Sequence, residues 1–71
     1  MDTKYAIWYN GDGDNPGCYV GPDGLLCAWR MGAEVFESRE SADAEIKRQG
    51  WINTTDSNRP GTAYVCEWVA G

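Results

Sequence analysis

The chain has 71 residues, of which six are basic and eleven acidic, with nine aromatic residues and no histidine. The net charge of −5 disfavours a nucleic-acid or anionic-membrane surface, because contact with phosphates requires a basic patch. The lack of histidine removes the usual general base of enzymes. No stretch of the chain approaches the length of a membrane span, which needs about 18 apolar residues. These bounds predict a single domain over residues 1–71 that binds a partner and is not an enzyme.

The first predicted element is a strand over residues 4–9, with the sequence KYAIWY. Both of its alternating faces are apolar, so we expect a central strand or one that is covered on both sides. The following run NGDGDNPG, residues 10–17, is dense in turn-forming residues and predicts a loop.

A hairpin is predicted next, with strands over residues 18–20 and 25–30. Pro22 fixes φ near −65°, which favours a type I turn over Pro22-Asp23 with Gly24 in the left-handed region. This turn sets a register with three pairs: Gly21 opposite Leu25, Val20 opposite Leu26, and Tyr19 opposite Cys27.

A short strand-like run at 33–37 precedes a helix predicted over residues 39–49. Ser38 is the candidate N-cap, and Gly50 stands where a helix-ending glycine belongs. The apolar stripe of this helix is thin, mainly Ala42 and Ile46, so the helix must lie flat on a sheet.

After a polar connection at 51–61, the alternation of residues 62–69 predicts a final strand. The fold class is therefore α+β: a small antiparallel sheet of about four strands with one helix packed on a face. Three or four strands precede the helix and one follows it, depending on whether residues 33–37 form a strand.

The two faces of this sheet differ in their apolar residues. If Ile7 and Val65 mark the face under the helix, a second group of side chains gathers on the other face: Trp8, Tyr64, Cys66 and Trp68. A large exposed aromatic face indicates an interface. Alternatively, long loops fold over these rings and complete the core, or the hairpin curls the sheet into a partial barrel.

The loop at 12–17 partly matches a calcium-binding EF-hand loop, since Asp12 and Asp14 fall at ligand positions. Pro16 replaces the next ligand, and no helix is predicted on either side, so an ordinary solvated turn is favoured. Pro16 and the two aspartates also argue against a phosphate-binding glycine loop at Gly11 and Gly13.

The three cysteines, Cys18, Cys27 and Cys66, form no Cys-x-x-Cys pair, and the hairpin register points Cys18 and Cys27 to opposite faces. They predict buried thiols in a reducing compartment. The N-terminus lacks the basic start and apolar run of a signal peptide, so a cytoplasmic location is expected. No cofactor and no metal are predicted.

Residues 34–45 hold five acids against Arg39, which predicts either an acidic stripe for a basic partner or a merely solvated face. The candidate partner-binding residues are the carboxylates Asp12, Asp14, Glu34, Glu37 and Glu40, with the aromatic anchors Trp8 and Trp68.

The runs VFESRESADAEIKRQGW (35–51) and AYVCEWV (63–69) resemble a pattern common in small orphan proteins of bacteriophages and mobile elements. Among these, anti-CRISPR proteins and similar inhibitors bind a host nuclease complex, and acidic residues commonly imitate phosphates there. The resemblance implies an inhibitor that acts in the host cytoplasm on a basic surface of a protein, such as a nucleic-acid-binding complex. The resemblance does not assign a functional role to any residue of this chain. The alternative is an interaction module that forms a homodimer or docks a peptide through its aromatic sheet face.

Overall fold

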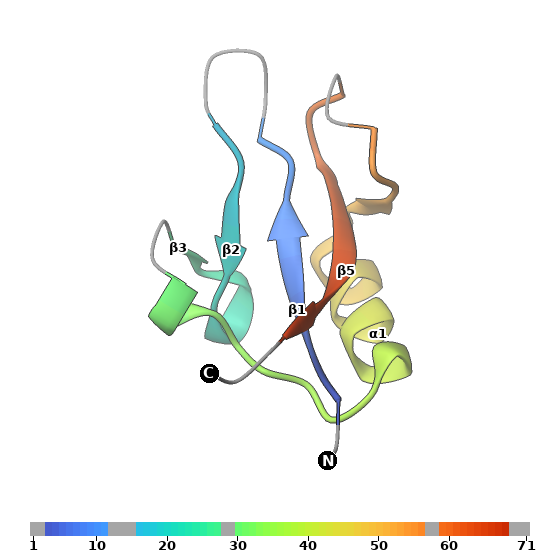
Figure 1. Cartoon of the computed structure of the whole chain (residues 1–71). Coiled ribbons are helices and arrows are strands. Elements are labelled where there is room, and N and C mark those ends of the chain that lie inside the picture. The colour runs from blue at the N-terminus through green and yellow to red at the C-terminus, as the bar shows by residue number, and fades with distance from the viewer. Residues whose placement is uncertain (1–2, 12–15, 28–29, 57–58, 69–71) are drawn as a thin grey trace.

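The computed structural model describes residues 3–11, 16–27, 30–56 and 59–68. Its strands are β1 (Lys4–Tyr9), β2 (Cys18–Val20), β3 (Leu26–Cys27), β4 (Ile52–Asn53) and β5 (Thr62–Trp68), its helix is α1 (Arg39–Gln49), and two short 3₁₀ turns cover Pro22–Gly24 (η1) and Arg30–Gly32 (η2). The strands form one sheet in the order β3-β2-β1-β5-β4, and α1 packs on one side of it (Figure 1). The predicted α+β class with one helix is confirmed.

The long antiparallel pair β1–β5 forms the centre of the sheet. Six residues of each strand are in register, with Ile7 opposite Val65 and Trp8 opposite Tyr64. Because side chains alternate along a strand, this register sends Ile7 and Val65 to one face and Trp8 and Tyr64 to the other. The division of faces expected from the sequence is therefore present.

The sequence predicted an antiparallel sheet, and this prediction is wrong in one respect: the sheet is mixed. β4 pairs with β5 in parallel, and the backbone N–H groups of Ile52 and Thr54 donate to the carbonyls of Gly61 and Ala63. The segment predicted as a polar connection thus contributes a two-residue edge strand. Two residues are too few to show a periodic pattern, so the sequence did not predict this strand. β4 follows directly after α1, and the position of the helix places it beside β5.

The hairpin of β2 and β3 has the predicted register, with Val20 opposite Leu26 and Tyr19 opposite Cys27. Its turn differs from the predicted type I turn. Asp23 has a φ of 59° and Gly24 a φ of 79°, so both lie in the left-handed region, as a type I′ turn requires. The primed turn is shifted by one residue past Pro22, and aspartate tolerates this conformation better than most residues.

The segment predicted as a strand at 33–37 forms only one bridge to the sheet. Tyr5 N–H donates to the Phe36 carbonyl at 3.0 Å, and Phe36 N–H donates back to the Tyr5 carbonyl at 2.7 Å. Glu34 N–H donates to the carbonyl of Val20. The segment therefore occupies the side of β1 that the short β2 leaves unpaired, and it leads the chain to α1.

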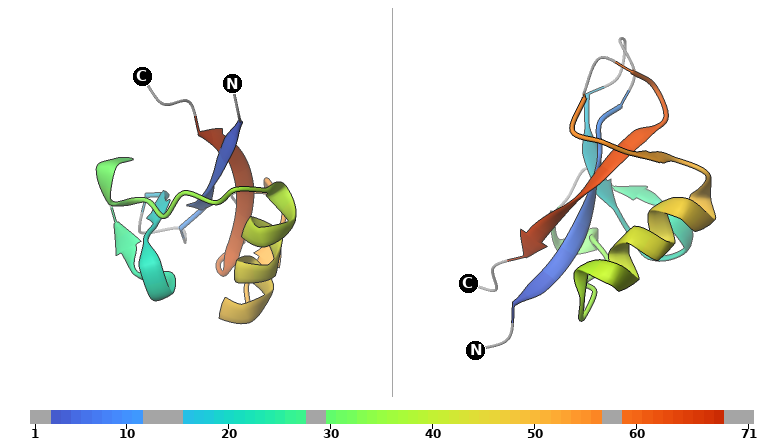
Figure 2. Two further views of the ribbon diagram at one scale, coloured as in Figure 1. Left: turned by 90° about the horizontal axis from the view of Figure 1, so that it is seen from below. Right: turned by 90° about the vertical axis from the view of Figure 1, so that its right-hand side faces the viewer.

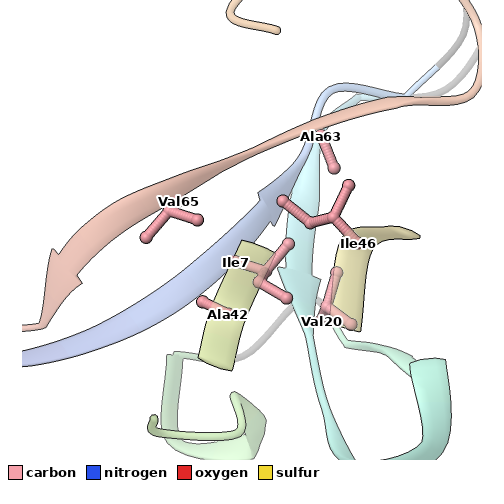
Figure 3. Packing of buried hydrophobic residues seen from close by; sticks show 6 residues of the cluster. All are labelled: Ile7, Val20, Ala42, Ile46, Ala63 and Val65. Atoms are coloured by element: carbon pink, nitrogen blue, oxygen red, sulfur yellow. The ribbon is translucent and has the colours of Figure 1, made fainter. Parts of the chain in front are cut away.

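Helix α1 has the predicted bounds and caps. Ser38 Oγ accepts a hydrogen bond from the Ser41 backbone N–H at 3.2 Å, and Gly50 ends the helix with a φ of 82°. The thin apolar stripe of Ala42 and Ile46 is completely buried. These side chains lie against those of the sheet in one small core, made up of Ile7, Val20, Ala42, Ile46, Ala63 and Val65 (Figure 3).

The sheet curls so that the hairpin turn meets the C-terminal end of α1 (Figure 2). A Cβ atom on Gly24 would lie 2.5 Å from the side-chain amide of Gln49, so glycine leaves the room for this contact. Arg48 and Gln49 both donate hydrogen bonds of 2.8 Å to the carboxylate of Glu45. The Arg48 guanidinium, followed by Gln49, holds the pKa of Glu45 below its usual value.

We expect Ser38→Ala to lower the free energy of unfolding by about 1 kcal/mol, because one backbone donor of the first helical turn loses its partner. Urea unfolding followed by circular dichroism measures this change. Ser41→Ala is the matched control, since it retains both the Ser38 hydroxyl and the backbone donor at position 41. An equal loss in the two variants would contradict the capping role.

Candidate partner-binding surface

The face of the sheet turned away from α1 is lined with aromatic side chains. In Figure 2, α1 and the hairpin turn lie on the same side of the β1–β5 pair, and no described helix or strand covers the opposite side. We call this opposite side the open face. Alternation along β1 and β5, with the register of β2, assigns its large residues: Trp8, Tyr19, Tyr64, Cys66 and Trp68.

Three of these rings form a connected cluster. Trp8 and Tyr19 are opposite each other on neighbouring strands, with ring centroids 4.9 Å apart and planes at 88°. Tyr19 meets Trp68 at 5.8 Å, also at 88°. Edge-to-face pairs at such distances are favourable beyond the area that they bury. We call Trp8, Tyr19 and Trp68 the aromatic cluster; each of these residues is half-buried.

The position of Trp8 depends on a glycine from the loop before β2. A Cβ atom on Gly17 would lie 2.6 Å from Nε1 of Trp8 and 2.7 Å from two ring carbons. The indole therefore rests directly against the backbone of Gly17. Together with Tyr19, this contact restrains the orientation of the Trp8 ring.

A salt bridge lies at the Trp68 end of the open face. Lys4 is opposite Trp68 in the register, and its Nζ lies 2.7 Å from Oε2 of Glu37. The Glu37 side chain is 84% exposed. The positive charge of Lys4 is thus paired with a carboxylate that remains largely exposed to solvent.

Cys66, on the open face, is held as a thiol by its surroundings. Cys66 Sγ donates to the carbonyl of Ala6 at 3.5 Å. Burial raises the pKa of the Cys66 thiol above its usual value. The thiolate is the reactive form of cysteine, and the raised pKa of Cys66 disfavours that form.

The opposite end of the open face is closed by a buried polar contact. Asn10 Nδ2 donates to Thr62 Oγ1 at 3.0 Å and to the Thr54 carbonyl at 2.9 Å. The Thr62 hydroxyl lies within hydrogen-bonding distance of the carbonyls of Asp56 and Arg59. These contacts fasten the described residues of the loop between β4 and β5 to this end of the sheet.

The predicted carboxylates are divided among different surroundings. Glu37 borders the open face, whereas Glu34 lies near the hairpin and adds to the negative field around Arg48. Glu40 is exposed in the first turn of α1, where a negative charge favours the helix. Asp12 and Asp14 lie outside the described residues.

The two predicted anchors, Trp8 and Trp68, are brought together through Tyr19. Sequence reasoning missed Tyr19, Gly17 and Lys4. The predicted hairpin register placed Tyr19 only against Cys27, because its pairing with Trp8 spans the long loop from 10 to 17. A glycine directly before a strand gives no signal that an indole will lie on it.

Among the described residues, no three cysteine, aspartate or glutamate side chains gather in a way that would hold a metal ion. None of the described helices has the length and apolar character needed to cross a membrane. Comparison with protein-family models, curated proteins and solved structures finds no match to this chain.

We expect Gly17→Ala to lower the free energy of unfolding by about 1–3 kcal/mol, because the new methyl group overlaps the Trp8 indole. Urea unfolding of the variant measures the cost. In a Trp8→Leu background the same glycine substitution should cost clearly less, since the smaller side chain leaves room. An unchanged cost in that background would contradict direct contact between Gly17 and Trp8.

Proposed function

We propose that this chain is a small acidic protein-binding domain that docks on a basic surface of its partner through the open face. The observation that carries the proposal is the aromatic cluster on the side of the sheet that no described helix covers. Tryptophan and tyrosine rings that are held in place before binding supply contact area at low entropic cost. Aromatic anchors of this kind dominate the energetics of many protein interfaces.

The charge of the chain supports a basic partner. The net charge is −5, and Glu37, at the border of the open face, is 84% exposed. An acidic protein attracts a basic surface over long distances and is repelled by nucleic acid itself. The proposed arrangement has aromatic rings at the centre of the interface and the carboxylate of Glu37 at its border, with Glu40 adding negative charge from the first turn of α1.

The helix and the closing strand resemble those of small phage proteins, and this resemblance suggests the kind of partner. The partner would be a host-defence complex that binds nucleic acid, of the kind that anti-CRISPR proteins inhibit in the host cytoplasm. Such a complex offers the basic channel that an acidic domain fits. The domain would then block the channel or the docking of another component.

A homodimer through the aromatic cluster is the second candidate, favoured by the same open face. Two copies that each carry a charge of −5 repel each other, which favours a basic partner over a second copy. Sedimentation velocity over a wide concentration range separates the two candidates. A monomer at all concentrations removes the homodimer, and a stable dimer that buries the cluster removes the proposed docking.

We expect capture of a basic, nucleic-acid-binding protein when the immobilised chain is exposed to a bacterial lysate and the bound proteins are identified by mass spectrometry. Retention should fall steeply as salt rises, because the attraction is partly electrostatic. Glu37→Lys combined with Glu40→Lys should weaken retention, and Trp68→Leu should weaken it independently of salt. Asp43→Lys is the matched control: this carboxylate bonds to Asn53 beside β4, away from the open face.

Retention that is unaffected by salt and by the paired lysine substitutions would contradict the electrostatic part of the proposal. Retention that is unaffected by Trp68→Leu would contradict docking through the open face. The inhibitory role has its own test, in which the chain is expressed in bacteria with active CRISPR immunity and phage plaques are counted. Restored plaque formation by the wild-type chain, but not by Trp68→Leu, is the expected result.

A further inference from the structure

We infer that the aromatic cluster selects arginine side chains of its partner, with a guanidinium stacked on the exposed part of Trp8 or Trp68. This inference rests on the proposed function and specifies the chemistry of that docking. It concerns which basic residue the open face recognises, and not only the sign of the partner's charge.

The rings of the cluster provide the negative faces that attract a cation. Indole is the strongest of the aromatic side chains in cation–π contacts. Trp8 and Trp68 each meet Tyr19 at 88°, and Trp8 also rests on Gly17. The rings are therefore oriented before binding, and an incoming side chain need not order them.

The charges around the cluster permit a second cation. The ammonium of Lys4 is paired with Glu37 at 2.7 Å, so its repulsion of an approaching guanidinium is compensated. Glu37 is 84% exposed and brings a carboxylate to the Trp68 end of the cluster. An arginine on the ring thus finds both a π face and a nearby acceptor for its N–H groups.

A contact between an arginine and an aromatic ring is already present within the chain, on the helix side of the same sheet. The guanidinium carbon of Arg39 lies 5.3 Å from the centre of the Tyr5 ring. Tyr5 stands on β1, three residues from Trp8 and on the other face. The proposed contact repeats this geometry on the open face, with the larger and more electron-rich indole in place of the phenol.

Arginine is favoured over lysine because its charge is planar and delocalised. A guanidinium stacks flat on a ring and is more weakly hydrated than an ammonium, so it loses less solvation on an aromatic surface. Its donors remain free at the edge to bond a carboxylate in the plane. A lysine ammonium satisfies the electrostatic attraction but lacks the stacking.

We expect octa-arginine to bind the wild-type chain at least about fivefold more tightly than octa-lysine, as one cation–π contact at a partly exposed site provides. Isothermal titration calorimetry at fixed ionic strength measures both affinities. Trp68→Leu and Trp8→Leu should lower the affinity for octa-arginine to about that for octa-lysine. Trp51→Leu is the matched control, because Trp51 packs with Tyr9 on the helix side.

The outcomes separate the inference from the function on which it rests. Equal binding of the two peptides, with both weakened by salt, overturns arginine selection and leaves the basic partner standing. Binding of neither peptide contradicts both. A loss in Trp51→Leu as large as in Trp68→Leu overturns the placement of the contact on the open face.

A measurement on the wild-type chain is independent of any loss of folding in the tryptophan variants. In a nitrogen-labelled sample, octa-arginine should shift the indole N–H signals of Trp8 and Trp68 and leave that of Trp51 in place. The δ-methylene protons of the peptide should move upfield, since a stacked guanidinium places them over a ring. Indole signals of Trp8 and Trp68 that stay unchanged at saturation would overturn the inference.

Discussion

The antiparallel pairing of β1 with β5 is the constraint on which the other features depend. Its register sets Ile7 beside Val65 and Trp8 beside Tyr64, and a shift by one residue would exchange the two sets of side chains. With this register, the aliphatic core residues Ile7 and Val65 face α1 together with the rings of Tyr5 and Tyr9, whereas Trp8, Tyr64 and Trp68 face outward. The core and the open face are therefore two results of the same ladder of hydrogen bonds.

The small core requires the sheet to curl around a single helix. Ala42 and Ile46 are the buried residues of α1, so the helix lies close to the strands and fills little volume. The hairpin turn supplies the missing cover by reaching Gln49, and Trp51 packs with Tyr9 beside it. The helix side is thereby closed with few aliphatic side chains, whereas none of the described helices or strands covers the rings of the open face.

The charged side chains differ in how far their hydrogen bonds and ion pairs leave them exposed. Glu45 is engaged by Arg48 and Gln49 and stabilises the end of the helix, and Asp43 bonds to Asn53. Glu37 pairs with Lys4 but remains largely exposed at the border of the aromatic cluster. Exposed pairs of this kind contribute little to stability. Glu37 is thus the carboxylate of the predicted stripe that combines exposure with a position beside the rings.

The sequence by itself determined the features that depend on neighbouring residues. Ser38 and Gly50 marked the ends of α1 because capping acts within one turn, and alternation separated Trp8 from Ile7 and Trp68 from Val65. The turn residues predicted the left-handed Gly24 and the hairpin register. They did not predict the left-handed Asp23, because Pro22 excludes a positive φ only at its own position.

Only the tertiary structure decided the contacts between segments far apart in the chain. These are the parallel pairing of β4, the bridge between Tyr5 and Phe36, and the meeting of Trp8, Tyr19 and Trp68. Each contact depends on the path that a loop takes between two segments. The residue types of a loop do not determine that path. The tryptophans were visible in the sequence as candidate anchors, but their assembly around Tyr19 is a property of the folded sheet.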